Sequence, residues 1–282
     1  MNRPGYVFDN AAPQAEQRFT SLERLYDEVT FRNLSAVGMG PGWHCLEVGA
    51  GGGSVARWLA CRAGPAGRVL ATDLNPRWMP PADTPALEVR RHDIVCDPLP
   101  EAEFGLIHAR LVLVHLPERE AVLRRMIAAL RPGGWLVIED FDMELIRRPA
   151  VRGSHGAELF GKYWQAMMAV LASHGADAGY AQTLPRLLED AGLQDVQAEG
   201  HLVVSRGGSP GAGLQRANLE QTRDELAATG LITHAEIGEL CEALADPRAS
   251  YLQPVLVSAR GRRPWKDNQR GAHSADHAER RW

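Results

Sequence analysis

The sequence predicts an α/β protein built on a doubly wound, mostly parallel sheet, and two observations support this prediction. Short apolar segments alternate with helical segments through the first half of the 282-residue chain, as parallel strands and their crossover helices do. A glycine cluster at residues 49–53 separates the first expected strand from the helix after it. In doubly wound sheets such a turn lies where ligands bind.

A helix is expected first, because apolar side chains recur with a helical period over residues 15–37. Strands and helices then alternate. Asn75 and Pro76 form a favourable N-cap and N1 pair for a short helix. Pro117 opens a longer amphipathic helix, and residues 131–134 (Arg-Pro-Gly-Gly) close it. The expected strands are 43–48, 68–73, 86–93, 104–109 and 135–142, and the expected helices are 54–63 and 117–130.

After residue 146 the rhythm changes. Helices are expected at 154–174, 181–192 and, as a pair, within 211–246, and strands at 196–206 and 252–260. The helical segments are longer than a crossover or a hairpin needs. Because their apolar faces must be buried, we expect them to form a helical lid over the carboxyl edge of the sheet. Packing of these helices on one another, or a homodimer contact, is the alternative.

These elements divide the chain into five parts. We expect an N-terminal helical cap (1–40), a ligand-binding core (41–146), a helical insertion or lid (147–195), two last strands (196–260) with an inserted helical segment (211–246), and a flexible tail (261–282).

Composition excludes several classes of function. The net charge of -4 and the pI near 6.2 do not suit a nucleic-acid binder, whose affinity comes from clustered Lys and Arg. No apolar run approaches the roughly 20 residues of a membrane helix, and residues 1–10 lack the apolar segment of a secretory signal. Four cysteines without CxxC spacing fit a reduced compartment. We expect a cytoplasmic protein with no membrane or nucleic-acid partner and no metal site; His273 and His277 are assigned to solvent.

The register of the glycine turn distinguishes between classes of ligand. A dinucleotide-binding fingerprint that begins at Gly49 needs its third glycine at position 54, which is Ser54. Glu47, two residues before Gly49, is not part of that fingerprint but suits a ligand that carries a cationic amine. A tight turn without a ligand is the alternative, and an NAD-dependent oxidoreductase is disfavoured.

Acidic residues follow the next two strands. Asp73 ends the second strand, where a carboxylate can accept hydrogen bonds from both hydroxyls of a ribose. Capping of the next helix is the alternative, but Asn75 and Pro76 already fill that role. Asp93 ends the third strand and can accept from an adenine amino group, with Ile94 offering an apolar face; a turn aspartate is the alternative.

Together with the segment Leu-Arg-Pro-Gly-Gly-Trp at 130–135, this pattern resembles the class I S-adenosylmethionine-dependent methyltransferase family, whose fold is Rossmann-like. The resemblance covers 43–142, and more loosely the chain to residue 260. The five motifs are, in order, EVGAGGG, ATDLNP, RRHDI, FGLIHARLVLVHLPE and LRPGGWLVIED. One departure is Gly105, where the family usually has Asp.

The resemblance implies S-adenosyl-L-methionine as the cofactor, held by residues at and after the ends of the first four strands. It places Gly49, Ala50, Gly51 and Gly53 against the methionine moiety, Glu47 near its amino group, Asp73 at the ribose, Leu74 beside the adenine, Asp93 and Ile94 at the adenine amino edge, and Ala109 beside the donor amino acid.

Methyl transfer is an in-line displacement, and a hydroxyl acceptor must also lose a proton. His115 is the candidate base, with a histidine hydrogen-bonded at the start of a helix as the alternative. Asp140 and Asp142 are second candidates, or else substrate contacts or caps. A stripe at helical spacing is either core or the lining of an apolar substrate pocket; it includes Tyr163, Trp164, Met167 and Met168.

We therefore expect methylation of a small-molecule metabolite, with O-methylation in secondary metabolism as the specific expectation. Two alternatives use the same cofactor motifs. The first is an enzyme of this fold that catalyses a cyclisation or another alkyl transfer. The second is a non-catalytic, cofactor-binding partner subunit.

Overall fold

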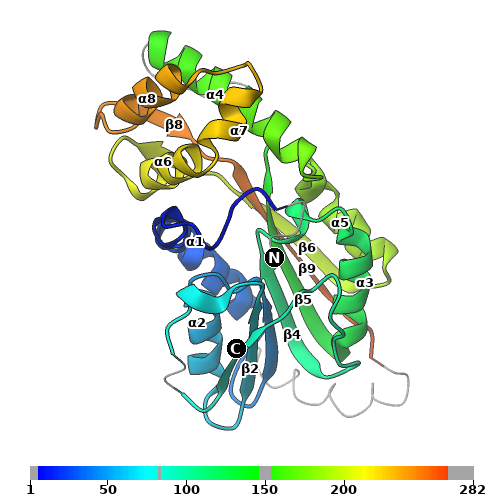
Figure 1. The fold of residues 1–282 in the computed structure, drawn as a ribbon. Helices are drawn as coiled ribbons and strands as arrows, with labels where there is room; N and C mark the ends of the chain where they lie inside the picture. The colour runs from blue at the N-terminus through cyan, green and yellow to red at the C-terminus, as the bar shows by residue number, and fades with distance from the viewer. Residues whose placement is uncertain (1–5, 82–83, 146–153, 266–282) are drawn as a thin grey trace, which may run out of the picture.

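A computed structural model describes residues 6–81, 84–145 and 154–265. Its main sheet contains β1 (His44–Val48), β2 (Arg68–Asp73), β3 (Leu87–Arg91), β4 (Phe104–Arg110), β5 (Leu130–Asp142), β6 (Gln194–His201) and β9 (Val255–Arg262). The strand order is β3-β2-β1-β4-β5-β9-β6 (Figure 1). Neighbouring strands from β3 to β5 are parallel, and β9 runs antiparallel to both β5 and β6. The predicted mostly parallel, doubly wound sheet is confirmed.

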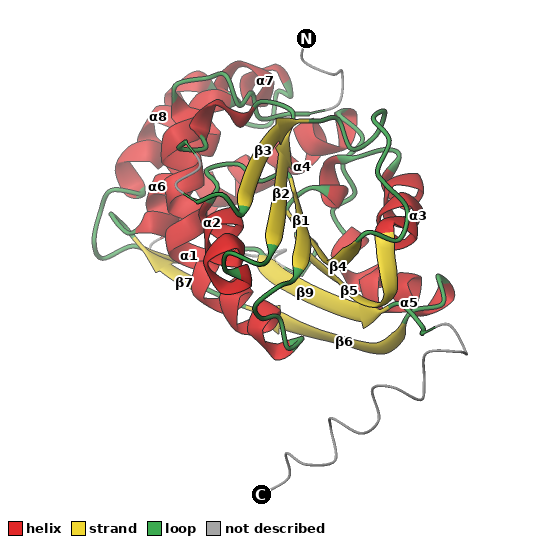
Figure 2. Ribbon diagram, turned by 90° about the horizontal axis from the view of Figure 1, so that it is seen from below, coloured by secondary structure: helices red, strands yellow, loops and turns green. Residues whose placement is uncertain are grey.

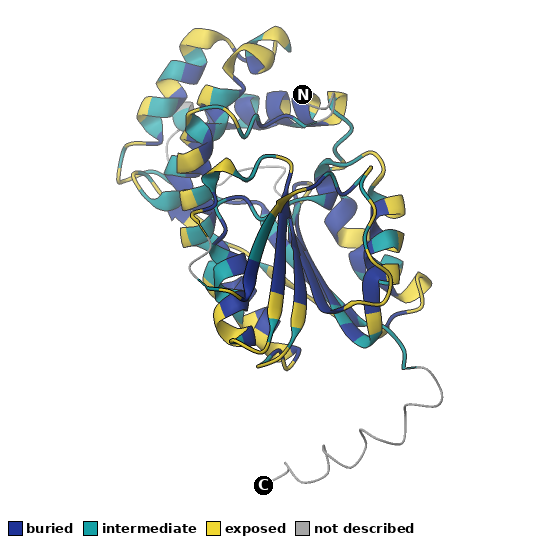
Figure 3. Cartoon of the chain, turned by 60° about the horizontal axis from the view of Figure 1, so that its bottom comes forward, coloured by how far each residue is buried: buried dark blue, intermediate teal, exposed yellow. Residues whose placement is uncertain are grey.

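Helices cover both faces of this sheet (Figure 2). On one face lie α1 (Gln14–Ala36) and α2 (Ser54–Ala63), and on the other α3 (Arg119–Ala129) and α5 (Tyr180–Asp190). The strands alternate accordingly, because successive side chains point to opposite faces. Leu46 packs with the α3 and α5 side, whereas Cys45 packs with α2. Both faces are therefore buried, as the dark centre of the sheet in Figure 3 shows.

A second group of elements lies together beside the sheet, at the top of Figure 1. It contains α4 (Ser154–Ser173), α6 (Pro210–Gln221), α7 (Arg223–Ala228), α8 (His234–Ala243) and a small antiparallel pair, β7 (Val204–Arg206) and β8 (Ser250–Leu252). These elements share an apolar core that includes Phe160, Leu226 and Leu240. Helix α6 also packs along α1. None of the helices in the described ranges is long and apolar enough to cross a membrane.

The expected lid segment 147–195 is only partly an insertion. Residues 147–153 lie outside the described residues, and α4 joins the second group. Helix α5 does not, since Tyr180, Leu184 and Leu188 are buried against the main sheet. Helix α5 therefore buries its apolar face against the sheet, as an ordinary crossover helix of the core does.

Both of the last expected strands are interrupted. The strand expected at 196–206 divides into β6 and β7, and the one expected at 252–260 divides into β8 and β9. Pro254, which has no N–H, stands at the second break, and the Gln253 N–H donates to Val203 O across it (2.9 Å). These two neighbouring segments thereby pass from the main sheet (β6 and β9) into the small sheet (β7 and β8). The helical segment 211–246 likewise forms three helices, not two.

Residues 131–134, expected to close the helix α3, belong to β5. A register shift between Phe104 and Leu106 accommodates them as a bulge, and the Gly133 N–H donates to Arg263 O (2.9 Å). The predicted start of the flexible tail, residue 261, is therefore too early in the sequence. Strand β9 continues to Arg262, whose guanidinium stacks over Trp265; residues 266–282 lie outside the described residues.

Candidate active site

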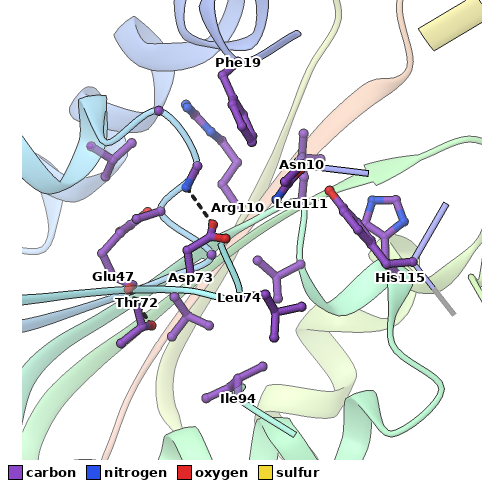
Figure 4. Close-up of a pocket in the computed structure, with 18 of the residues that line it drawn as sticks. Asn10, Phe19, Glu47, Thr72, Asp73, Leu74, Ile94, Arg110, Leu111 and His115 are labelled. Carbon is purple, nitrogen blue, oxygen red and sulfur yellow. Dashed lines mark hydrogen bonds between the residues drawn. The ribbon is translucent and has the colours of Figure 1, made fainter. Parts of the chain in front are cut away.

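A cavity of about 160 Å³, the donor cavity, opens at the carboxyl edge of the parallel strands (Figure 4). The loops after β1, β2, β3 and β4 and the helix α1 form its walls. Of the residues expected from the sequence, Glu47, Gly49, Ala50, Gly51, Asp73, Leu74, Asp93, Ile94 and His115 line it. Two expected residues lie outside its lining: Gly53 is the N-cap of α2, and Ala109 of β4 is buried in the apolar core that the sheet forms with α3 and α5.

The turn after β1 needs glycine for two physical reasons. Gly49 and Gly51 have φ values of 69° and 55°, which side chains other than glycine rarely adopt. The turn is also crowded, since a Cβ on Gly51 would lie 2.8 Å from the ring of Phe19. Helix α1 therefore packs directly on the turn.

Asp73 ties the first two loops of the donor cavity together. Its Oδ2 accepts the Gly51 N–H (3.0 Å) and its Oδ1 accepts the Asn75 N–H (2.8 Å). Asn75 and Pro76 begin the short helix as predicted, although the Asn75 side chain makes no capping bond and Asp73 instead accepts the Asn75 N–H. Each carboxylate oxygen can accept a further hydrogen bond, so the structural role leaves Asp73 able to bind a ligand. Asp93 has a similar turn role, with its Oδ1 accepting the Val95 N–H (2.9 Å).

A buried chain of ionisable groups runs inward from Glu47. Glu47 Oε2 lies 2.6 Å from His108 Nδ1, and His108 Nε2 lies 3.4 Å from Glu139 Oε2. Burial alone lowers the pKa of His108, but the two carboxylates more than offset this and raise it to about 9. Burial raises the pKa of Glu47. Burial also acts to raise the pKa of Glu139, but His108, Arg110 and Thr30 together outweigh it and lower that pKa to about 2. An imidazolium is therefore held between two carboxyl groups.

Helix α1 is anchored to this charged centre. Thr30 and Asn33 of α1 both donate to the Glu139 carboxylate, and Ser258 Oγ of β9 donates to it at 2.8 Å. Arg110 at the end of β4 donates to Thr30 Oγ1, and also pairs with Asp27 of α1 (2.9 Å in both cases). The wall that α1 adds to the donor cavity is thus fixed by hydrogen bonds to two strands, β4 and β5.

A second cavity of about 60 Å³, the acceptor-side cavity, adjoins the donor cavity. Both are lined by Arg18, Leu22, Leu111 and His115. The stripe singled out in the sequence lies in this second lining: Tyr163, Trp164, Met167 and Met168 of α4. Its volume is well below the roughly 150 Å³ of an apolar cavity that binds benzene. Side chains must move to admit a ring, which suits flexible methionines.

His115 ends a short 3-10 helix (Leu113–His115) between the two cavities. The rings of Tyr6 and Phe8 lie edge-on to it, with centroids 5.4 and 6.1 Å away. Burial and the nearby Arg18 and Arg119 lower its pKa to about 3. His115 is the candidate base expected from the sequence, and a pKa this low leaves it neutral and only weakly basic. Its Nδ1 has no hydrogen-bond partner among the described residues, so the hydrogen-bonded alternative does not hold at this atom.

The two aspartates at the end of β5 hold loops. Asp140 Oδ2 accepts the Val114 N–H (3.2 Å) and thereby fixes the segment that carries His115; burial raises the pKa of Asp140 to about 8. Asp142 Oδ1 accepts N–H groups of Glu144 and Leu145. The capping alternative describes both. Within the described part of the chain, no cluster of three or more His, Cys, Asp or Glu could hold a metal ion.

A family model described as a methyltransferase domain matches residues 14–198. The chain belongs to the class I S-adenosylmethionine-dependent methyltransferases. Methyltransferase str2 of Strobilurus tenacellus is 37% identical over 164 residues, 55% of each chain. Ubiquinone/menaquinone biosynthesis C-methyltransferase UbiE of Laribacter hongkongensis is 29% identical over 126 residues, 43% of this chain and 50% of that protein. The chain thus spans about half the length of these curated relatives.

Solved structures agree with the methyltransferase fold. The YcgJ protein of a Bacillus species has a TM-score of 0.57 at 11% identity, over 86% of this chain and all of its own. Phosphoethanolamine N-methyltransferase 2 of Haemonchus contortus, solved with phosphomonomethylethanolamine and S-adenosylhomocysteine, has a TM-score of 0.56 at 15% identity, over 94% of this chain and 61% of its own. At these identities the likeness shows the fold alone.

Sequence reasoning missed part of the methyltransferase's site. Arg18, Phe19 and Glu23 of α1 line the donor cavity, although the sequence predicted a helical cap there without singling out any of its residues. His108 and Glu139 were also missed. Their signal was present, since His108 interrupts an apolar strand and Glu139 directly follows the apolar run Trp-Leu-Val-Ile at 135–138. Buried charges of this kind are almost always paired.

Proposed function

We propose that this methyltransferase moves the methyl group of S-adenosylmethionine, bound in the donor cavity, to a small molecule bound in the acceptor-side cavity. The observation behind this proposal is that the two cavities share a wall made of Arg18, Leu22, Leu111 and His115. A donor and an acceptor that meet at such a wall can be held in line, and alignment provides much of the rate enhancement of a displacement.

The donor cavity fits the cofactor in its charges and its apolar surface. Glu47 offers a carboxylate to the cationic amine, and the glycine turn allows the methionine moiety to approach the backbone. Asp73 has acceptor capacity for the ribose hydroxyls. Leu74 is 43% exposed at the cavity, as suits a side chain that an adenine covers, and Asp93 and Ile94 complete that end. When bound, the cofactor supplies an electrophilic methyl group on a sulfonium.

The acceptor-side cavity suits a partly apolar small molecule. Apolar and methionine side chains of α4 and α6 surround it, and these helices act as the lid that excludes water from the transfer. O-methylation in secondary metabolism is the specific reaction that we propose. C-methylation is the second candidate, because the UbiE relatives carry it in their name.

The test is incubation with methyl-labelled cofactor and phenolic and hydroquinone acceptors, with the labelled atom located by NMR. Label on oxygen supports the proposal, and label on carbon supports the second candidate. Cofactor that is consumed while no product carries label would indicate a different reaction of the same cofactor. No turnover at all would favour a non-catalytic subunit.

His115→Ala is expected to lower turnover by about 2- to 10-fold, the effect of one lost hydrogen bond. A histidine with a pKa near 3 stays neutral at working pH, so it can orient an acceptor hydroxyl but is a weak base. The pH–rate profile of the wild type should accordingly show no ionisation of His115 near pH 6.5. A fall of more than 100-fold in His115→Ala, together with loss of such an ionisation, would instead identify a general base.

Met167→Ala is expected to shift acceptor preference toward bulkier molecules, because it removes a wall of the acceptor-side cavity. Cofactor affinity should change by only a few tenths of a kcal/mol, as for independent sites. Relative kcat/KM for a series of ring-substituted acceptors and calorimetry with S-adenosylhomocysteine measure the two effects. Met126→Ala is the matched control, since Met126 is equally buried but lies in the core under the sheet. A Met126→Ala variant with the same shift in preference would contradict the assignment.

A further inference from the structure

At the junction of the two cavities lies a cationic side chain for which the described residues offer no counter-charge. Arg18 of α1 lines both cavities and is only 6% exposed. Its Nη2 donates to two neutral acceptors, Tyr6 Oη (3.2 Å) and Asn10 Oδ1 (2.8 Å). Within the described structure its Nε is buried and makes no hydrogen bond, and none of the side-chain partners found for Arg18 is a carboxylate.

Aromatic rings hold this guanidinium in place. Its central carbon lies 4.9 Å from the ring centroids of both Phe8 and Phe19. Cation–π contacts offset only part of the loss of hydration, and a buried charge without a partner is costly. The site is therefore built to be completed by an anion that brings its own oxygen to Nε.

The position of the acidic residues indicates on which side that anion lies. The donor cavity is lined by several carboxylates, among them Glu23, Glu47 and Asp73. None of the described residues that line the acceptor-side cavity is acidic, so Arg18 gives that cavity its charge. The positive potential is thus directed toward the acceptor and opposes a cationic amine there.

Part of the lining of the acceptor-side cavity is polar but neutral. Gln215 accepts from Tyr163 Oη (2.7 Å) and donates to Gln253 (2.8 Å). Asn218, in the same lining, has a buried Oδ1 without a partner in the described structure. This atom can accept a hydrogen bond from a ligand. The lining therefore matches an apolar body that carries an anionic oxygen and a separate hydrogen-bond donor.

We infer that the acceptor is a phenol or an enol bound as its anion, with the oxygen paired to Arg18. The inference rests on the proposed function and specifies its substrate class. Arg18 stabilises the deprotonated oxygen, so the acceptor gives its proton to solvent on binding and no strong base is needed beside it. For O-transfer, the oxygen then forms a bond to the methyl carbon as the carbon–sulfur bond breaks and the electron pair stays on sulfur. A methyl ether and a neutral thioether result.

Binding of 4-nitrophenol tests this directly, because its anion absorbs visible light and its neutral form does not. The wild type, saturated with S-adenosylhomocysteine and held below the solution pKa of the phenol, should bind it and increase the anion absorbance. Arg18→Met should weaken binding of the anion by about 10- to 100-fold, as for a lost hydrogen bond to a charged group. Arg32→Met is the matched control, since Arg32 is an exposed residue of the same helix.

Calorimetry with S-adenosylhomocysteine separates the ways in which the inference can fail. Unchanged affinity in Arg18→Met shows that the site has folded and that Arg18 does not serve the cofactor. A loss of ten-fold or more would place Arg18 at the cofactor and overturn the inference, while leaving the proposed function intact. A wild type that binds S-adenosylhomocysteine but not the phenolate also overturns it. A wild type that binds neither overturns the proposed function itself.

Turnover provides a second readout. With labelled cofactor, 4-methylphenol should be methylated and its isomer benzyl alcohol should not, because the two differ mainly in acidity. Arg18→Lys, which keeps the charge without the fork of donors, should retain part of the rate with 4-methylphenol. Equal rates for the two isomers would contradict a bound anion.

Discussion

Glu139→Ala is expected to lower the free energy of unfolding by about 3–5 kcal/mol, the usual cost of removing one partner from a buried ion pair. The variant leaves the His108 imidazolium with one carboxylate, and it deprives Thr30, Asn33 and Ser258 of their acceptor. Urea unfolding followed by circular dichroism measures the loss. Glu199→Ala is the control, because Glu199 pairs with Arg32 at the surface, where an ion pair contributes less than about 1 kcal/mol. Similar losses in both variants would contradict the assignment.

The pH dependence of this loss follows from the pKa values of the pair. The pKa of Glu139 is lowered from 4.5 to about 2, so its contribution is present above pH 4.5 and disappears as the pH falls through 2. The pKa of His108 is raised from 6.5 to about 9, so its contribution is present below pH 6.5 and disappears as the pH rises through 9. The difference in stability between wild type and Glu139→Ala should therefore be largest between pH 4.5 and 6.5. A difference that grows above pH 9 would contradict this charge assignment.

Asp73→Ala is expected to weaken binding of S-adenosylhomocysteine by about 1.5–3 kcal/mol, the range for hydrogen bonds to a charged group. The variant removes the proposed ribose acceptor and also the bond that fixes the Gly51 N–H. Titration calorimetry measures the loss. Asp97→Ala controls for a loosened loop, because Asp97 accepts the Asp93 N–H but does not line the donor cavity. Unchanged affinity in Asp73→Ala would end the ribose assignment.

Local sequence patterns predicted the strands and the cavity wall that they form. The glycine turn, Asp73 and Asp93 each lie at or just after the end of a strand. The topology of a parallel sheet brings these strand ends together. The same reasoning could not place Arg18 on the shared wall, because that depends on where α1 packs. It could not foresee the pair of His108 and Glu139 either, since only the strand order makes β4 and β5 neighbours.

Other differences have tertiary causes as well. The apolar face of α5 looked the same as that of a lid helix, and only the space available on the sheet decides between the two. The pKa of His115 depends on burial and on two nearby arginines: Arg18, which is distant in the sequence, and Arg119, which begins the next helix. Residue type alone predicted a titrating histidine, and the surroundings produce a neutral one.

The position of β9 imposes an order on the maturation of the newly synthesised chain. Strand β6 leaves the ribosome before β9, yet of the described strands it hydrogen-bonds only to β9, which separates it from β5. Until residues 255–262 emerge, β5 presents an unpaired edge and β6 has no place in the sheet. Exposed edges of this kind invite aggregation. Ser258 arrives on the same strand and completes the hydrogen bonds of Glu139, so closure of the sheet and burial of its charged centre finish together. Truncation before β9 should accordingly yield a chain that depends on chaperones instead of a smaller folded domain.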